Sequence, residues 1–142
     1  MTEIKVIQCP LAQAAGKIVA LAGEAGCRDN IFIVYDRNVA GIVERLGLEA
    51  KGTLAIDGTE ESKSFETVAL ICRWLMDLGA DRNAFVLGIG GGITTDMTGF
   101  AASVYKRGVK FAFLPTTLLA QVDAAIGGKN GVNLDSFKNM MG

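Results

Sequence analysis

The amino-acid sequence predicts an α/β fold in which a doubly wound parallel sheet lies between two layers of helices. Strand-length apolar runs alternate along the chain with segments whose apolar residues recur at helical spacing. The clearest runs are apolar throughout, as is typical of parallel strands that are buried on both faces. The chain has 142 residues and is about one domain long. These observations favour right-handed strand–helix–strand units in one Rossmann-like domain.

The first half of the chain is expected to contain three strands and three helices. Apolar residues from Leu11 to Ala22 recur at helical spacing, and the run IFIVYD has the length and β-branched composition of a strand. Gly47 can end a helix, and Ser64 can cap the start of one. The expected strands span residues 4–8, 31–36 and 53–57, and the expected helices span residues 11–25, 38–46 and 64–78.

The alternation is clearer in the second half. The run AFVLGI is continuous and apolar, and VKFAFL is a second such run that ends at Pro115. The segment TTLLAQVDAAI is typical of a helix, which Gly127 and Gly128 would end. The expected strands span residues 84–89 and 109–114, and the expected helices span about 95–105 and 116–126.

Polar residues follow four of the expected strands at the point where each strand ends. They are Asp36, Asp57, the turn at residues 90–96, and Thr116 with Thr117. Parallel strands end at the same edge of a sheet, and ligands of such sheets bind in the crevice outside that edge. We therefore expect these four strand ends to converge on one ligand crevice.

The turn GIGGGITTDMTGF, residues 88–100, is the first candidate binding element. Its consecutive glycines remove the Cβ atoms that would keep a ligand from the backbone. The N–H groups that begin the next helix, from Ile93 to Asp96, then favour an anion. The turn is not the dinucleotide fingerprint G-x-G-x-x-G, because Thr95 stands at its third glycine, and no P-loop lysine follows. A tight turn with close helix–strand packing is an alternative explanation.

Two carboxylates near the expected crevice each have two explanations. Asp96 can gain stability from the helix dipole, or it can accept hydrogen bonds from ligand hydroxyls. Asp36 stands where nucleotide-binding folds commonly contact a ribose, but it can equally cap a turn or helix. A pyrophosphate at the glycines with sugar hydroxyls near Asp96 would accommodate both kinds of charge.

The other polar candidates are hydroxyls, a charged loop and a set of cations. Thr116 and Thr117 can simply cap a helix. Glu60 and Lys63 lie three residues apart in the loop DGTEESK, which by itself is typical of a solvated surface. Several cations near the expected crevice suit a small polyanionic substrate, although each can also be an ordinary surface residue; they are Lys106, Arg107, Lys129 and Lys138.

Composition excludes several classes of function. A net charge of −1 does not suit a nucleic-acid or membrane-surface partner. No apolar run reaches the roughly 20 residues of a membrane span, and the N-terminus lacks a signal-peptide core. A cytoplasmic protein is therefore expected. The chain has no histidine and its three cysteines lack metal-ligand spacing, so no metal site is expected within it.

The chain resembles one enzyme family, most densely in its second half. The segment GGGITTDMTGFAASVYKRGVKFAFLPTTLLAQVDAAIGGKNGVNLDSFKN is similar to 3-dehydroquinate synthase, and the combination of RGV, PTTLLAQVD and GGK is specific. The resemblance covers the whole chain, clear at DGTEESK and densest from residue 86 onward. It implies that residues 1–142 are an N-terminal NAD-binding domain, a fragment of a two-domain enzyme whose helical second domain supplies the metal ligands.

The resemblance also implies roles for individual residues. The residues implied to contact NAD are Asp36, Asn38, Glu60, Lys63, Gly91, Gly92, Ile93, Thr94, Thr95, Asp96, Thr116 and Thr117, with Lys129 and Lys138 close by. The residues implied to surround the substrate and serve catalysis are Arg107, Asp123, Lys129, Lys138 and Asn139. Three positions depart from the family pattern. They are Thr95, which could cap the helix in place of a glycine, Asn130 and Phe137.

The implied reaction converts 3-deoxy-D-arabino-heptulosonate 7-phosphate to 3-dehydroquinate and phosphate. It uses NAD, and a divalent metal, zinc or cobalt, in the full-length protein only. A phosphorylated sugar acid is therefore the implied substrate, and a homodimer is the usual family state. Two alternatives stay open. The parent enzyme could be another sugar-phosphate cyclase or a metal-dependent polyol dehydrogenase, and the isolated chain could be a nucleotide-binding module without activity.

Overall fold

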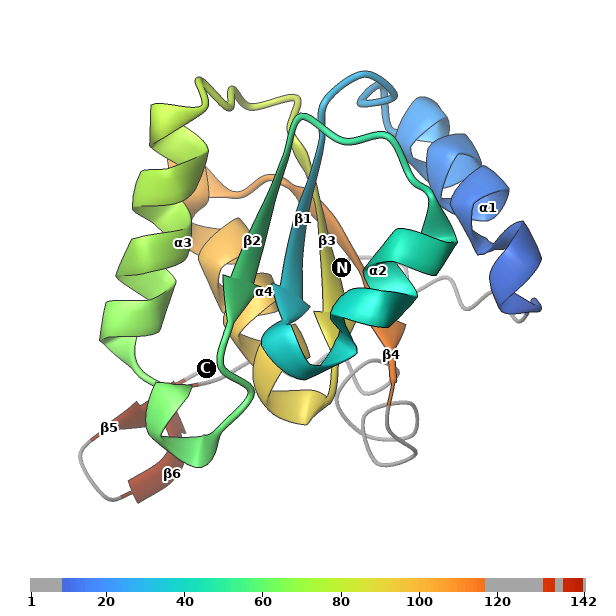
Figure 1. Ribbon diagram of the computed structural model, residues 1–142. Coiled ribbons are helices and arrows are strands. Elements are labelled where there is room, and N and C mark those ends of the chain that lie inside the picture. The colour runs from blue at the N-terminus through green and yellow to red at the C-terminus, as the bar shows by residue number, and fades with distance from the viewer. Residues whose placement is uncertain (1–8, 117–131, 135–136, 142) are drawn as a thin grey trace.

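The computed structural model describes residues 9–116, 132–134 and 137–141. Its main sheet has four parallel strands in the order β2-β1-β3-β4. The strands are β1 (Ile31–Asp36), β2 (Gly52–Ile56), β3 (Phe85–Gly90) and β4 (Lys110–Pro115). All four arrowheads in Figure 1 point toward the same edge of the sheet. The predicted doubly wound parallel sheet is confirmed.

Of the four α-helices, α1 precedes β1 and the other three connect consecutive strands of the main sheet. Three of the four expected ranges are correct to within about two residues. The helices are α1 (Leu11–Glu24), α2 (Ala40–Leu46), α3 (Phe65–Asp77) and α4 (Gly92–Val104). Short 3-10 turns extend the connections at η1 (Arg37–Val39), η2 (Glu60–Ser62) and η3 (Tyr105–Arg107). Gly47 ends α2 in the left-handed conformation, and the hydroxyl of Ser64 accepts from the Thr67 amide at 3.4 Å.

The helices form two layers, one on each face of the sheet (Figure 1). Side chains of β1 alternate between the faces: Phe32 and Val34 pack with α3 and α4, while Ile31 and Ile33 pack with α1 and α2. β3 is buried along its whole length because both faces are covered. The two apolar clusters hold the strand ends in a fixed register, which positions the residues that follow them.

The expected start of α4 is wrong by three residues. The helix begins at Gly92, and its N-cap residue is Gly91. Thr95 therefore does not cap the helix; its amide donates to the Gly91 carbonyl at 3.0 Å, and its hydroxyl donates to the Gly92 carbonyl at 3.2 Å. The glycines do not form a separate loop, because the backbone enters the helix as soon as β3 ends.

Some expected elements lie outside the described residues. They are the strand at 4–8 and the helix at 116–126, apart from Thr116. Two short strands that the sequence did not predict, β5 (Val132–Leu134) and β6 (Phe137–Met141), pair antiparallel. In the part of the chain that the structure describes, no helix combines the length and apolarity needed to cross a bilayer.

Gly16→Ala is expected to stabilise the protein, because Gly16 is exposed within α1 and an added Cβ has no heavy atom within 4 Å. Alanine loses less backbone entropy than glycine in a helix, so the free energy of unfolding should rise by roughly 0.5–1 kcal/mol. Urea denaturation followed by circular dichroism measures the change. A destabilised variant would show that this face of α1 is not open to solvent.

Candidate functional site

The ends of the four parallel strands form one continuous edge. A Cβ on Gly58, after β2, would collide with the carboxylate of Asp36 at the end of β1. A Cβ on Gly90, the last residue of β3, would lie 3.0 Å from the Cβ of Asp36. The Thr116 amide, after β4, donates to the Gly90 carbonyl at 2.8 Å. The predicted convergence of the strand ends is confirmed for these residues.

The helix α4 begins at this edge without a side-chain cap. Its N-cap residue, Gly91, has no side chain, and residues 91–93 are partly exposed. The first N–H groups of a helix have no acceptor within it. Together with the helix dipole, these groups can bind an anion that approaches the glycines.

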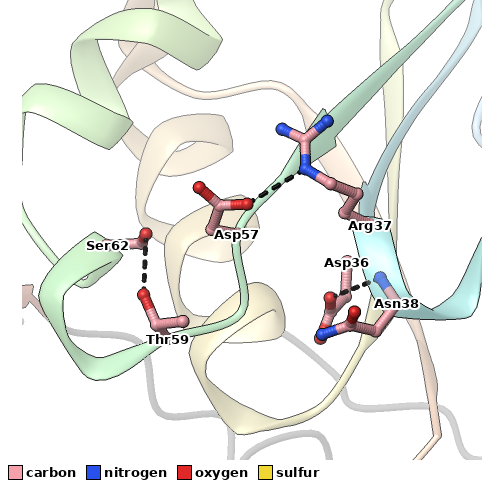
Figure 2. Close-up of polar contacts among 6 residues, drawn as sticks. All are labelled: Asp36, Arg37, Asn38, Asp57, Thr59 and Ser62. Atoms are coloured by element: carbon pink, nitrogen blue, oxygen red, sulfur yellow. Dashed lines mark hydrogen bonds and ion pairs between the residues drawn. The ribbon is translucent and has the colours of Figure 1, made fainter.

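Asp36 caps the turn that follows β1. Its Oδ1 accepts from the Asn38 amide at 2.9 Å, which holds the carboxylate at the strand end. Beside it, Arg37 Nε lies 3.0 Å from Asp57 Oδ1, and both side chains are 61% exposed. Figure 2 shows these two contacts side by side, one on the β1 exit and one between the β1 and β2 exits. The capping explanation of Asp36 is confirmed, and a ribose contact at Asp36 stays a prediction.

Lys63 and Asp96 form a buried ion pair. Lys63 Nζ lies 3.0 Å from Asp96 Oδ2, and the two side chains are only 8% and 14% exposed. The solvated-loop explanation is therefore wrong for Lys63, whereas Glu60 in the η2 turn is exposed. The pair joins the turn after β2 to α4, two segments at the carboxyl edge of the sheet. A buried charge needs such a partner, because its desolvation is otherwise very costly.

The side chains of Thr94 and Thr95 face the protein interior. Both residues are fully buried, and Thr94 lies against Gly90, where an added Cβ would come within 2.8 Å of the Thr94 Cβ. The Thr94 hydroxyl is a buried side-chain group with no hydrogen-bond partner among the described residues. Their side chains are not available to a ligand, and the Thr95 amide already donates to the Gly91 carbonyl at 3.0 Å.

Arg107 lies at the opposite edge of the sheet from the crevice. α4 starts at the carboxyl edge and runs back, so η3 at its end precedes the amino end of β4. Lys106 and Arg107 there adopt left-handed backbone angles, with φ of 45° and 68°. The expectation that Lys106 and Arg107 add charge beside the crevice of their own chain is therefore wrong. A substrate contact by Arg107 stays a prediction.

The remaining expected site residues cannot be placed as side chains. Thr117, Asp123, Lys129 and Asn130 lie outside the described residues. Phe137, Lys138 and Asn139 belong to β6, for which the structure describes the strand pairing alone.

The described residues offer no metal centre. Within residues 9–116, 132–134 and 137–141, no three His, Cys, Asp or Glu side chains are grouped to hold an ion. Burial raises the pKa of the Cys27 and Cys72 thiols, so both favour the neutral form, which binds metals poorly.

Sequence reasoning missed three features of the site. The Lys63–Asp96 pair joins residues far apart in sequence, and no local pattern marks it. The Arg37–Asp57 pair also joins residues far apart in sequence and is not marked by a local pattern. Gly58 was detectable in principle, since an Asp-Gly dipeptide after a strand signals a turn. Its close approach to a carboxylate on another strand was not.

The fold and the site define a doubly wound α/β domain with an anion-favouring helix end at the carboxyl edge of its sheet. A family model described as 3-dehydroquinate synthase N-terminal matches residues 53–142. The chain belongs to this family.

Curated relatives agree with this assignment. The chain is 36% identical to a 3-dehydroquinate synthase of Paracoccus denitrificans, over 99% of this chain and 39% of the relative. It is 49% identical to one of Campylobacter curvus, over 78% of this chain and 33% of the relative. The chain thus spans about a third of the length of these relatives.

Solved structures extend the likeness to related cyclases. A 2-epi-5-epi-valiolone synthase from Streptomyces hygroscopicus with NAD+ and Zn2+ bound matches all of this chain and 40% of its own, with a TM-score of 0.81 and 32% identity. A 2-deoxy-scyllo-inosose synthase complexed with carbaglucose-6-phosphate, NAD+ and Co2+ matches 88% of this chain and 37% of its own, with a TM-score of 0.73 and 30% identity. An iron-containing alcohol dehydrogenase from Corynebacterium glutamicum, at 13% identity, shares the fold.

Proposed function

We propose that this chain is the NAD-binding domain of a 3-dehydroquinate synthase, a lyase that converts 3-deoxy-D-arabino-heptulosonate 7-phosphate to 3-dehydroquinate and phosphate. The observation that carries the proposal is the uncapped start of α4 at the edge where the four parallel strands end. Such a helix end suits the pyrophosphate of a dinucleotide. Family membership and the NAD+ bound to the valiolone synthase support the choice of NAD.

The described residues suggest how NAD would be held. The backbone N–H groups at the start of α4 would donate to the pyrophosphate, because the glycines leave the backbone open. The carboxylate of Asp36, fixed by the Asn38 amide, would accept from a ribose hydroxyl. Glu60 is exposed in the neighbouring η2 turn and can reach the same crevice. Bound NAD would supply reversible hydride transfer.

A metal is part of the proposal only for the whole protein. The described residues do not group the ligands that zinc or cobalt would need, so we assign no metal-dependent step to them. The substrate residues are proposed by the family resemblance to be Arg107, Asp123, Lys129, Lys138 and Asn139. Because Arg107 lies at the far edge of its own sheet, its role requires a site outside the crevice described above.

Two alternatives give different outcomes. If the whole protein is another sugar-phosphate cyclase, it will bind NAD but release no phosphate from the heptulosonate phosphate. The curated relatives favour 3-dehydroquinate synthase over that reading. For the isolated chain we favour a nucleotide-binding module without turnover. Phosphate release by the 142-residue chain alone would refute that part of the proposal.

Calorimetric titration with NAD tests the crevice. We expect weak binding by the isolated chain, and Asp36→Asn should raise the dissociation constant about tenfold, the cost of one charge-assisted hydrogen bond. The asparagine keeps an acceptor for the Asn38 amide, so the turn should survive. Asp29→Asn, an equal charge change at an exposed residue before β1, is the matched control and should leave affinity unchanged.

The outcomes separate the roles of Asp36. Unchanged affinity in Asp36→Asn would leave this residue as a turn cap and remove it from the NAD site. If titration of the wild-type chain with NAD gives no detectable heat even at millimolar NAD, the proposed binding site itself is contradicted.

A further inference from the structure

Three charged side chains follow one another at the ends of β1 and β2. Along the carboxyl edge of the sheet, the strand order places Gly90 of β3 beside Asp36 of β1, and Asp57 comes directly after β2. Arg37 follows Asp36 in the chain, and its Nε lies 3.0 Å from Asp57 Oδ1. The carboxylate proposed to contact a ribose is therefore next to a cation whose charge a second carboxylate offsets.

The packing of these segments shows that they form one surface. A Cβ on Gly90 would lie 3.0 Å from the Asp36 Cβ, and a Cβ on Gly58 would collide with the Asp36 carboxylate. Asp36 thus lies between the glycine turn and the segment that carries Asp57. Figure 2 shows the Arg37 side chain extended toward Asp57, while the Asp36 carboxylate turns toward Asn38.

We propose that the Arg37–Asp57 pair makes the nucleotide site selective for NAD over NADP. The two dinucleotides differ by one phosphate, which NADP carries on the 2′-oxygen of its adenosine ribose. Asp36 favours a hydroxyl at that position, and Asp57 holds the neighbouring guanidinium that would otherwise pair with a phosphate there. This inference rests on the proposed NAD site, and it assigns to Arg37 and Asp57 the choice between two dinucleotides.

Charge explains the preference. A carboxylate at a strand end accepts a hydrogen bond from a ribose hydroxyl, whereas a nearby arginine accommodates the 2′-phosphate of NADP. A guanidinium binds phosphate through charge-assisted hydrogen bonds, so a free arginine beside Asp36 would favour NADP. Here two carboxylates, Asp36 and Asp57, face one guanidinium, and the group keeps a net negative charge. A phosphate is therefore disfavoured at this position.

The exposure of the pair sets the size of the effect. Both side chains are 61% exposed, and an exposed ion pair changes an equilibrium constant by at most about fivefold. Loss of the Asp57 carboxylate releases the guanidinium and also removes one charge that repels a phosphate. Asp57→Asn should therefore favour NADP relative to NAD by about fivefold, and the exposed position should tolerate the change.

Calorimetric titrations with NAD and with NADP test the inference through the ratio of the two dissociation constants. The wild-type chain should bind NADP about tenfold more weakly than NAD, because NADP lacks the hydroxyl that Asp36 contacts. Asp57→Asn should narrow this ratio about fivefold. Asp29→Asn, an equal charge change at an exposed residue before β1, is the matched control and should leave the ratio unchanged.

A double-mutant cycle separates a pair from two independent charges. Arg37→Gln should weaken NADP binding about fivefold more in the Asp57→Asn background than in the wild-type chain, because only there is the guanidinium free to bind the phosphate. Equal effects of Arg37→Gln in the two backgrounds would show that Asp57 does not hold Arg37, and they would overturn the proposal.

Other outcomes distinguish this inference from the proposed function. Equal wild-type affinities for NAD and NADP, or an unchanged ratio in Asp57→Asn, would overturn the selectivity and leave the NAD site in place. A narrowed ratio in Asp29→Asn as large as that in Asp57→Asn would show a general charge effect and contradict the pair. If the wild-type chain binds neither dinucleotide, the proposed function fails and the inference fails with it.

Discussion

Lys63→Met is expected to lower the free energy of unfolding by about 3 kcal/mol, one of the two largest losses we predict. Methionine fills most of the volume of the lysine stem, so packing changes little. The loss comes from Asp96, whose carboxylate is 14% exposed and would lose the ammonium 3.0 Å away. Removal of one member of a buried ion pair takes away the opposite charge that offsets the desolvation of the other. Guanidinium denaturation measured by circular dichroism gives the value.

Lys51→Met is the matched control for this prediction. Lys51 is exposed and its ammonium contacts the side chain of Asn30 at 2.7 Å, so its loss should change the free energy of unfolding by no more than about 0.5 kcal/mol. Lys63→Met with Asp96→Asn should recover part of the loss, because the carboxylate charge is gone. A loss below about 1 kcal/mol in Lys63→Met alone would mean that water reaches Asp96 more freely than its exposure indicates.

The fold was predictable because its dominant signals are local. The run at residues 31–36 matches β1 at both ends, since five apolar or aromatic residues that end at Asp36 are typical of one buried strand. Ser64 and Gly47 act as the expected helix boundaries. The Ser64 hydroxyl accepts from the amide of Thr67, three residues later, and Gly47 adopts the left-handed backbone conformation that ends α2. Alternation of such segments is enough to fix a parallel sheet with helices on both faces.

The site was predictable only as far as topology determines it. Parallel strands had to end at one edge, so the convergence of Asp36, Gly90 and Thr116 followed from the strand order. The start of α4 did not follow, because glycine propensity suggests a loop where tertiary packing supports a helix. The position of Arg107 was misjudged for a related reason: residues at the far end of a crossover helix lie at the opposite edge.

The role of Asp96 shows what pairwise contacts add. From sequence, its carboxylate was either a helix-end charge or an acceptor for sugar hydroxyls, and neither explanation included Lys63. The pairing depends on how the turn after β2 folds against α4, which no spacing rule encodes. Family resemblance named both residues as neighbours of NAD, but it did not indicate that they bind each other.

Gly90→Ala is the second change with a large expected effect, a loss of about 3 kcal/mol in the free energy of unfolding. Gly90 has a φ of 156°, which side-chain-bearing residues rarely adopt. Its added Cβ would lie 2.8 Å from the Thr94 Cβ on one side and 3.0 Å from the Asp36 Cβ on the other. Thermal and urea denaturation should both report the loss, while Gly16→Ala, the same change at an open site, should stabilise.

The atoms that crowd Gly90 explain why a second substitution should not restore the stability lost in Gly90→Ala. Thr94→Ala would remove the hydroxyl but keep the Cβ that lies 2.8 Å away, so it should not rescue Gly90→Ala. Relief requires α4 to move away from β1, which would carry its first N–H groups away from Asp36 and weaken NAD binding as well. A Gly90→Ala chain as stable as wild type would contradict this packing. Such a chain would show that the strand ends approach one another less closely than the contacts of Gly90 indicate.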